Sequence, residues 1–76
     1  MPDASDIQML RQARDRSAKL LADLLRQSQE LEASPPKIPP ADLAEGRKAM
    51  TNAIAAARKM VQSLDAALQA AQNPLP

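Results

Sequence analysis

The stretch Ser34-Pro35-Pro36-Lys37-Ile38-Pro39-Pro40 separates two long segments of the chain and decides its fold. Proline fixes its own φ angle, lacks an N–H donor and disfavours helix in the residue before it, so two Pro-Pro pairs cannot lie inside a helix. We therefore predict a hinge at residues 34–40, largely in extended polyproline II conformation, between two helices. Ile38 is the only large apolar residue of the hinge, and we expect it to fold back onto the helix ends.

The segment before the hinge has the periodicity of an amphipathic helix. Ser5 and Gln8 have capping-box spacing, which predicts a helix from about residue 5 to residue 33. The opposite face carries charges of alternating sign, as a solvated helix surface does. The broad apolar face, which includes two serines, consists of Ile7, Leu10, Ala13, Ser17, Leu20, Leu21, Leu24, Leu25, Ser28 and Leu31.

The segment after the hinge predicts a second helix from about residue 41 to residue 72, followed by a frayed tail at 73–76. Pro40 suits the first helical position, and Asp42 with Glu45 repeats the cap spacing. One stripe recurs at alternating spacings of four and three: Leu43, Arg47, Met50, Ile54, Ala57, Val61, Leu64, Leu68 and Ala71. A second stripe of mostly small residues lies beside it: Ala49, Ala53, Ala56, Met60, Ser63, Ala67 and Ala70. These small residues either admit a second neighbouring helix or only supply helix propensity.

Folding the two helices back at the hinge brings their apolar stripes together along one line of contact, here called the seam. Arg14 and Arg47 fall on it, and we expect their stems to pack while their charged ends reach water; the alternative is that they fix the register. Gly46 either permits close approach near the turn or is a tolerated helix defect. The predicted opposing pairs are Leu31–Leu43, Leu24–Met50, Leu21–Ile54, Ser17–Ala57, Leu10–Leu64 and Ile7–Leu68.

The predicted fold is therefore all-α, a two-helix antiparallel hairpin with a Pro-rich turn. With 76 residues, no Cys and no His, the chain has neither disulfides nor the usual zinc ligands to support so small a core. We expect the hairpin to complete a four-helix bundle, by self-association or with another helical protein. The residues predicted to bind the partner are Leu21, Leu24, Met50, Ala53, Ile54, Ala56, Met60, Val61, Leu64 and Leu68.

The composition argues against catalysis. The chain lacks His, Cys, Tyr, Trp and Phe, and its single glycine excludes a glycine-rich phosphate loop. Asp65 has no obvious second acid, so we expect no enzyme activity, no metal, no cofactor and no small-molecule substrate. No apolar run reaches 18 residues, and the apolar faces lack the Trp and Phe that anchor helices at membrane surfaces. We expect a cytoplasmic protein without a membrane partner.

Two other binding functions follow from shorter patterns. Arg47, Lys48, Arg58 and Lys59 form two basic pairs on the second helix, which suit an RNA-binding hairpin homodimer that grips duplex phosphates. The absence of aromatic residues removes base stacking, and the net charge of +1 does not by itself indicate a polyanion partner. Residues 36–39 match the PxxP pattern that SH3-type domains read, although the hinge already explains these prolines.

The segment Lys48-Ala49-Met50-Thr51-Asn52-Ala53-Ile54-Ala55, preceded by a Pro-containing turn, resembles the second helix of the small co-chaperones of type III secretion needle subunits. The needle subunits themselves are similar in length and in their order of helix, turn and helix. The resemblance implies a hairpin that joins a larger helical-repeat chaperone to mask the needle subunit. It also implies that Met50, Ile54, Val61 and Leu64 face the partner.

Overall fold

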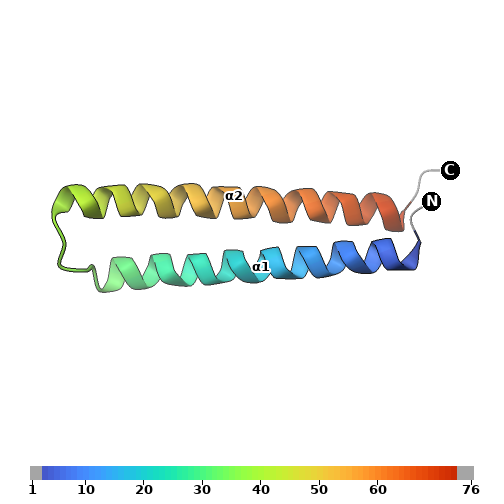
Figure 1. Cartoon of the computed structure of the whole chain (residues 1–76), viewed down its shortest axis with the longest axis horizontal. Coiled ribbons are helices and arrows are strands. Elements are labelled where there is room, and N and C mark those ends of the chain that lie inside the picture. The colour runs from blue at the N-terminus through green and yellow to red at the C-terminus, as the bar shows by residue number, and fades with distance from the viewer. Residues whose placement is uncertain (1–2, 74–76) are drawn as a thin grey trace.

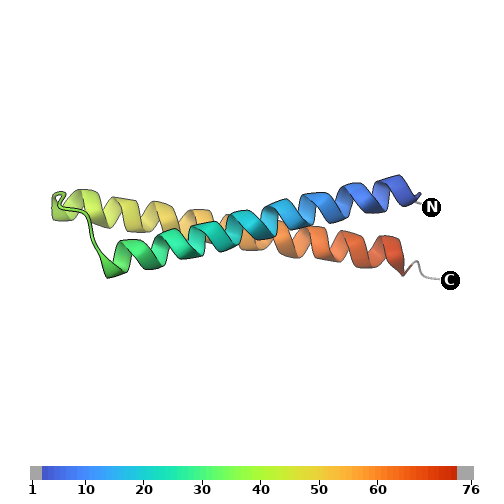
Figure 2. The same cartoon turned by 90° about the horizontal axis from the view of Figure 1, so that it is seen from below.

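The computed structural model describes residues 3–73, which form two antiparallel helices joined by a hinge (Figure 1). Helix α1 spans Ala4–Ala33 and helix α2 spans Pro40–Gln72. They run side by side along their whole length and cross at a shallow angle (Figure 2). The predicted all-α helical hairpin is confirmed. The prediction of a frayed tail lies, from residue 74 onward, outside the described residues.

Helix α1 begins with a capping box two residues earlier than the one we predicted. The Asp3 side chain accepts a hydrogen bond from the Asp6 N–H at 2.9 Å, and the Asp6 side chain accepts one from the Asp3 N–H at 3.4 Å. The prediction that Ser5 caps the helix was wrong, because Asp3 and Asp6 have the same three-residue spacing. Both carboxylates also lie where the helix dipole favours negative charge.

The hinge keeps the expected extended character at its end. Pro39 has φ −55° and ψ 145°, close to polyproline II, and Pro40 occupies the first turn of α2 as predicted. Among residues 3–73 no side chain caps α2, so the Asp42–Glu45 cap that we predicted does not form. The Ile38 N–H donates to the Pro36 carbonyl at 3.0 Å, and the Ile38 side chain stays 44% exposed. This side chain therefore does not fold back under the helix ends as expected.

The hairpin has very little buried interior. Among the described residues only Ser17, Ala57 and Leu68 are buried, and the first two are a predicted opposing pair. Small side chains halfway along each helix let the two backbones approach where the helices cross. A Cβ atom added to Gly46 would meet nothing within 4 Å, so this glycine is not required for close approach within the hairpin.

The molecule is a thin rod with principal extents of 57, 15 and 14 Å. Its radius of gyration is 17.0 Å, whereas a compact domain of this length has one of about 11 Å. Two helices packed along a single line bury one strip of each and leave the flanks of the seam open. The candidate functional surfaces are these flanks.

Candidate functional site

The structure divides the residues predicted to bind a partner into two groups. Leu68 is buried against α1, and Met60 and Ala56 are exposed. The others are half-buried where the two helices meet: Leu21, Leu24, Met50, Ala53, Ile54, Val61 and Leu64. A partner that left the hairpin intact would therefore reach Ala56 and Met60 directly and the half-buried residues only at the edges of the seam.

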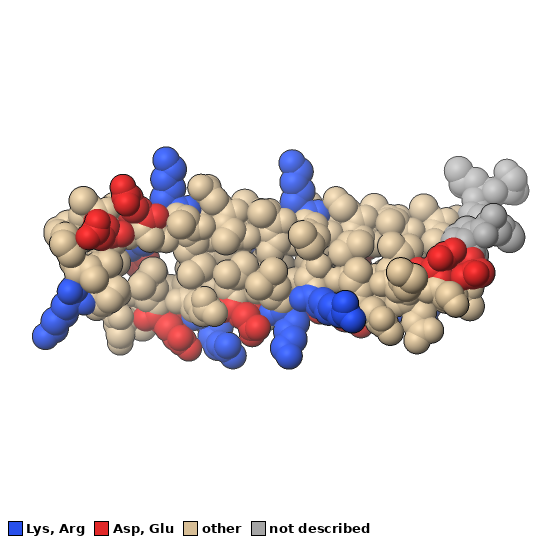
Figure 3. All heavy atoms as spheres, viewed as in Figure 1, with Lys and Arg blue, Asp and Glu red and all other residues tan. Residues whose placement is uncertain are grey.

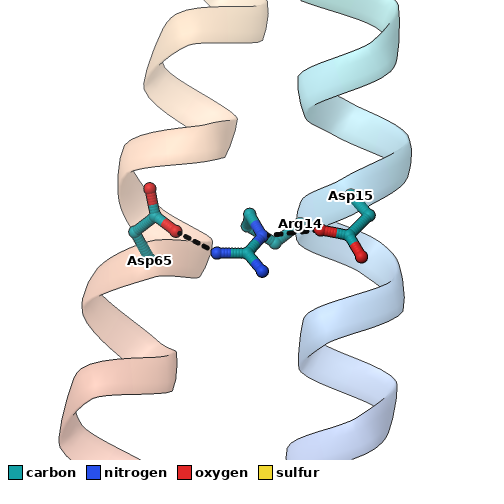
Figure 4. A network of polar contacts seen from close by, with 3 residues as sticks. All are labelled: Arg14, Asp15 and Asp65. Carbon is teal, nitrogen blue, oxygen red and sulfur yellow. Dashed lines mark hydrogen bonds and ion pairs between the residues drawn. The ribbon is translucent and has the colours of Figure 1, made fainter.

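One flank of the seam is crossed by ion pairs between the helices. Arg14 Nη1 lies 3.2 Å from Asp65 Oδ1, and Arg47 Nε lies 2.9 Å from Glu32 Oε1. Arg14 Nε also contacts Asp15 Oδ1 of its own helix at 2.8 Å, so its guanidinium joins carboxylates from both helices (Figure 4). We call this flank, defined by Arg14, Asp65, Arg47 and Glu32, the ion-paired face.

Hydrogen bonds to Asp15 and Asp65 raise the pKa of the Arg14 guanidinium above its ordinary value. Arg14 therefore places a charged group at a seam position where the stripe pattern otherwise has apolar residues. The side chains of Arg14 and Asp65 are 35% and 46% exposed, so water screens the pair substantially. Both seam arginines reach out of the seam as expected, and each contacts an acid of the other helix.

These cross-helix pairs do not follow from the apolar stripes alone, which contain no acidic residue. That Asp65 has no obvious second acid bears on catalysis and not on ion pairing, and Asp65 lies about one turn beyond the level that faces Arg14. The register set by the hinge, applied to the charged residues beside the seam, predicts that Arg14 and Asp65 lie within reach of each other. The same register also pairs Arg47 with Glu32.

The other flank of the seam is apolar. Asp65 and Met60 are five residues apart, which places them about 140° from each other around α2. On α1, Leu20 lies about 120° from Glu32 by the same measure. Because the ion-pairing side chains of both helices meet on one side of the seam, Leu20 and Met60 share the opposite side. The hydrogen bond from Ser17 Oγ to Met60 Sδ, at 3.1 Å, links the two helices there.

Large apolar side chains are exposed along this flank. Met9 is 67% exposed, Leu20 50% and Met60 51%. Met9 is eleven residues from Leu20, and therefore within about 20° of it around α1. The small stripe of α2 lies on the same side, within about 80° of Met60. We call this flank the apolar face, defined by Met9, Ala13, Leu20, Ala49, Ala53, Ala56, Met60, Ser63, Ala67 and Ala70.

The space-filling view shows how charge is distributed over one side of the rod (Figure 3). Lysine, arginine, aspartate and glutamate side chains gather along the outer edges and at the two ends, whereas most of the band where the helices meet is uncharged. An uncharged strip bordered by charges is typical of a surface that packs against another protein.

The basic residues proposed for RNA binding do not act as one group. Arg47 is ion-paired with Glu32, whereas Lys48, Arg58 and Lys59 make no ion pair with any described residue. By helical position these three side chains lie on the outer side of α2, about 100° or more around the helix from Met60. The two binding hypotheses therefore use different surfaces of the same rod and can be tested separately.

Within residues 3–73, no group of three or more acidic side chains is placed to hold a metal ion. Over the same residues, neither helix has a stretch both long and apolar enough to cross a membrane.

Comparisons of the chain with protein-family models, with curated proteins and with solved structures found no significant match.

Proposed function

We propose that this chain is a non-enzymatic interaction module that assembles with another helical surface through its apolar face. The observation that carries the proposal is the exposure of Met9, Leu20 and Met60 on one flank of a hairpin that buries only three of its described residues. Fully covering a side chain of this size contributes about 1.5–3 kcal/mol. A second helical layer would supply the hydrophobic core that the hairpin lacks.

The total surface area supports the same conclusion. The chain exposes 5894 Å², whereas a compact monomer of 8.2 kDa exposes about 4500 Å². An excess of this size, roughly 1400 Å², is the scale of surface that proteins remove from water when they form stable complexes. Packing the apolar face against another helical layer would remove much of this excess.

The first experiment measures absolute mass by light scattering with refractive-index detection, because the chain has no Tyr or Trp for absorbance. Helicity and thermal midpoint are followed by circular dichroism over a wide range of chain concentration. The proposal expects association with a mass above 8.2 kDa, or a poorly helical chain that becomes helical with a partner. A fully helical monomer whose midpoint does not depend on concentration would contradict the proposal.

A chaperone or adaptor subunit is a narrower form of this function. The resemblance to the needle co-chaperones implies it, and it requires a different chain on the apolar face. If the chain is a chaperone or adaptor subunit, the isolated protein should be poorly helical. Addition of a larger helical protein from the same cell should restore its helicity.

RNA binding is the second candidate function. The observation that favours it is that Lys48, Arg58 and Lys59 are exposed and make no ion pair with any described residue. Charge reversal at Arg58 and Lys59 should abolish binding of a duplex RNA and leave assembly unchanged, and the affinity should fall steeply with added salt. Absence of binding to duplex RNA at low salt would exclude this candidate.

A further inference from the structure

We propose that the occupant of the apolar face is a second copy of this chain, packed antiparallel to the first. This inference rests on the proposed function and names its partner. The two hairpins would be related by a dyad nearly perpendicular to the rod. In this arrangement α1 packs against α1 of the second copy, and α2 packs against α2 of the second copy.

The area of the face suits a pair of equal chains. The rod is 57 Å long and 15 Å wide, which gives a footprint of roughly 850 Å² in projection, close to the 800 Å² or so that each partner buries in a standard stable interface. A second copy has the same length and the same apolar band. It therefore covers the whole face without leaving part of either band in water.

Charges at the rim of α1 select the antiparallel arrangement. Arg16 and Asp23 are seven residues apart on α1, at the border of the apolar face, and Asp23 Oδ1 also lies 3.4 Å from Arg26 Nη2 of its own helix. When α1 packs antiparallel against its copy about a centre between residues 19 and 20, each Arg16 lies level with the other Asp23. The symmetric pair of chains then gains this attraction twice.

The parallel arrangement brings like charges together. With Ser17 opposite Ala57 in each hairpin, a parallel copy places its α2 over α1 at matching levels. Arg16 then lies level with Lys59 of the second copy, and Glu30 lies level with Glu45. Like charges that face each other across an interface oppose association. The charge pattern therefore favours the antiparallel pair.

Side-chain size along α2 fits the same dyad. Ala49, Ala56 and Ser63 are spaced by seven residues, so an antiparallel copy centred on Ala56 places Ala49 opposite Ser63. The larger Met60 side chain then lies opposite Asn52, within about 1.5 Å of the level of the small Ala53 of the second copy. Because Ser17 faces Ala57, Ala56 lies level with Ala18, about 2 Å from the α1 centre between residues 19 and 20. A dyad inclined slightly to the rod passes both centres and brings the two Leu20 side chains close together.

Disulfide cross-linking tests the pairing directly, because the natural chain has no cysteine. The Ala56→Cys chain should form a covalent dimer under mild oxidation roughly tenfold faster than the Ala55→Cys chain, whose thiol lies on the outer side of α2. In an equimolar mixture, Ala49→Cys chains should cross-link to Ser63→Cys chains. Each variant by itself should form hardly any covalent dimer. Non-reducing electrophoresis measures both results.

A charge exchange gives a second readout. Arg16→Asp alone should raise the dimer dissociation constant roughly 2- to 30-fold, since two exposed pairs are lost and like charges replace them. Asp23→Arg alone should act similarly, and the chain with both substitutions should recover the original constant. Sedimentation equilibrium measures the constants.

The outcomes separate this inference from the proposed function. If Ala56→Cys cross-links no faster than Ala55→Cys although the chain associates, the antiparallel pairing is wrong and the interaction module stands. If the isolated chain neither associates nor folds, the occupant of the apolar face is a different protein. The antiparallel self-pairing is then wrong, and the proposed interaction module still stands. If the chain is a stable helical monomer at every concentration, both proposals fail.

Discussion

The ion-paired face and the apolar face flank the same seam, but they leave different kinds of side chain in water. On the first, Arg14 and Arg47 reach across to acids of the other helix, so its polar groups find partners within one chain. On the second, the exposed fractions of Leu20 and Met60 are 50% and 51%, because the described part of the chain covers only about half of each. The hairpin thus pairs the charged groups of one flank and leaves large apolar side chains of the other flank exposed to water.

The energies of the two faces differ as well. Exposed ion pairs contribute about 0.2–1 kcal/mol each, whereas each large apolar side chain contributes about 1.5–3 kcal/mol once it is fully covered. The ion-paired face therefore sets which residues of α1 and α2 face each other, and the apolar face holds most of the free energy that assembly can release. Each prediction below changes one flank or the seam between them.

The largest effect is expected from charging the apolar face. Replacing both Leu20 and Met60 by lysine should abolish association and most of the helicity, because about 1.5–3 kcal/mol of burial is lost for each side chain on each chain. Scattering mass and circular dichroism measure the two effects. The matched control is Gln12→Lys with Gln62→Lys, which adds the same charge at exposed positions outside the apolar face. Unchanged mass and helicity in the Leu20 and Met60 variant would show that the apolar face is not an interface.

A smaller effect is expected from overfilling the seam that both faces share. Ala57 is 4% exposed, so Ala57→Leu should force the helices apart where they cross and lower the free energy of unfolding by about 1–3 kcal/mol. Urea unfolding at matched chain concentration measures the change. Ala66→Leu is the control, since Ala66 is an exposed position of the same helix. Equal midpoints for the two variants would mean that the helices do not cross at Ala57.

The sequence predicted the hairpin correctly because prolines and apolar periodicity act locally. The prolines of the hinge end α1 independently of the rest of the chain. The apolar stripe with four-three spacing on α2 is buried only when it faces α1. The N-terminal cap was misplaced by two residues, because Asp3–Asp6 and Ser5–Gln8 satisfy the same spacing rule and only the folded geometry chooses between them.

The candidate site was predicted less completely than the fold. The small stripe of α2 was found, but its continuation through Leu20 and Met9 on α1 was not, because it depends on which flanks of two helices share a side. That information comes from contacts between the helices, such as Arg14 with Asp65 and Ser17 with Met60. A periodicity within one helix does not contain it.

A stabilising change is expected at Gly46. A Cβ atom there meets nothing within 4 Å and the residue lies inside α2, so Gly46→Ala should raise the free energy of unfolding by about 0.5–1 kcal/mol. Ala44→Gly, two residues away, should lower it by a similar amount. A loss of stability in Gly46→Ala would show that an assembled neighbour packs against the bare backbone, and would extend the apolar face toward the hinge.

The smallest effect is expected on the ion-paired face. A double-mutant cycle with Arg14→Gln and Asp65→Asn should give a coupling energy of about 0.2–1 kcal/mol, because both side chains are more than one-third exposed and water screens them. Asp15, 2.8 Å from Arg14 Nε, keeps a carboxylate beside the guanidinium when Asp65 is neutralised, which limits the loss further.

Salt distinguishes this small coupling from the large effect on the apolar face. At about 1 M NaCl the screening length falls to about 3 Å, so the Arg14–Asp65 coupling should shrink toward zero in urea unfolding. Association through the apolar face should persist or strengthen, because burial of Leu20 and Met60 does not depend on charge. A coupling that exceeded about 2 kcal/mol and did not respond to salt would mean that Arg14 and Asp65 are shielded from water in the assembly. The second layer would then cover the ion-paired face, and the assignment of the two faces would be reversed.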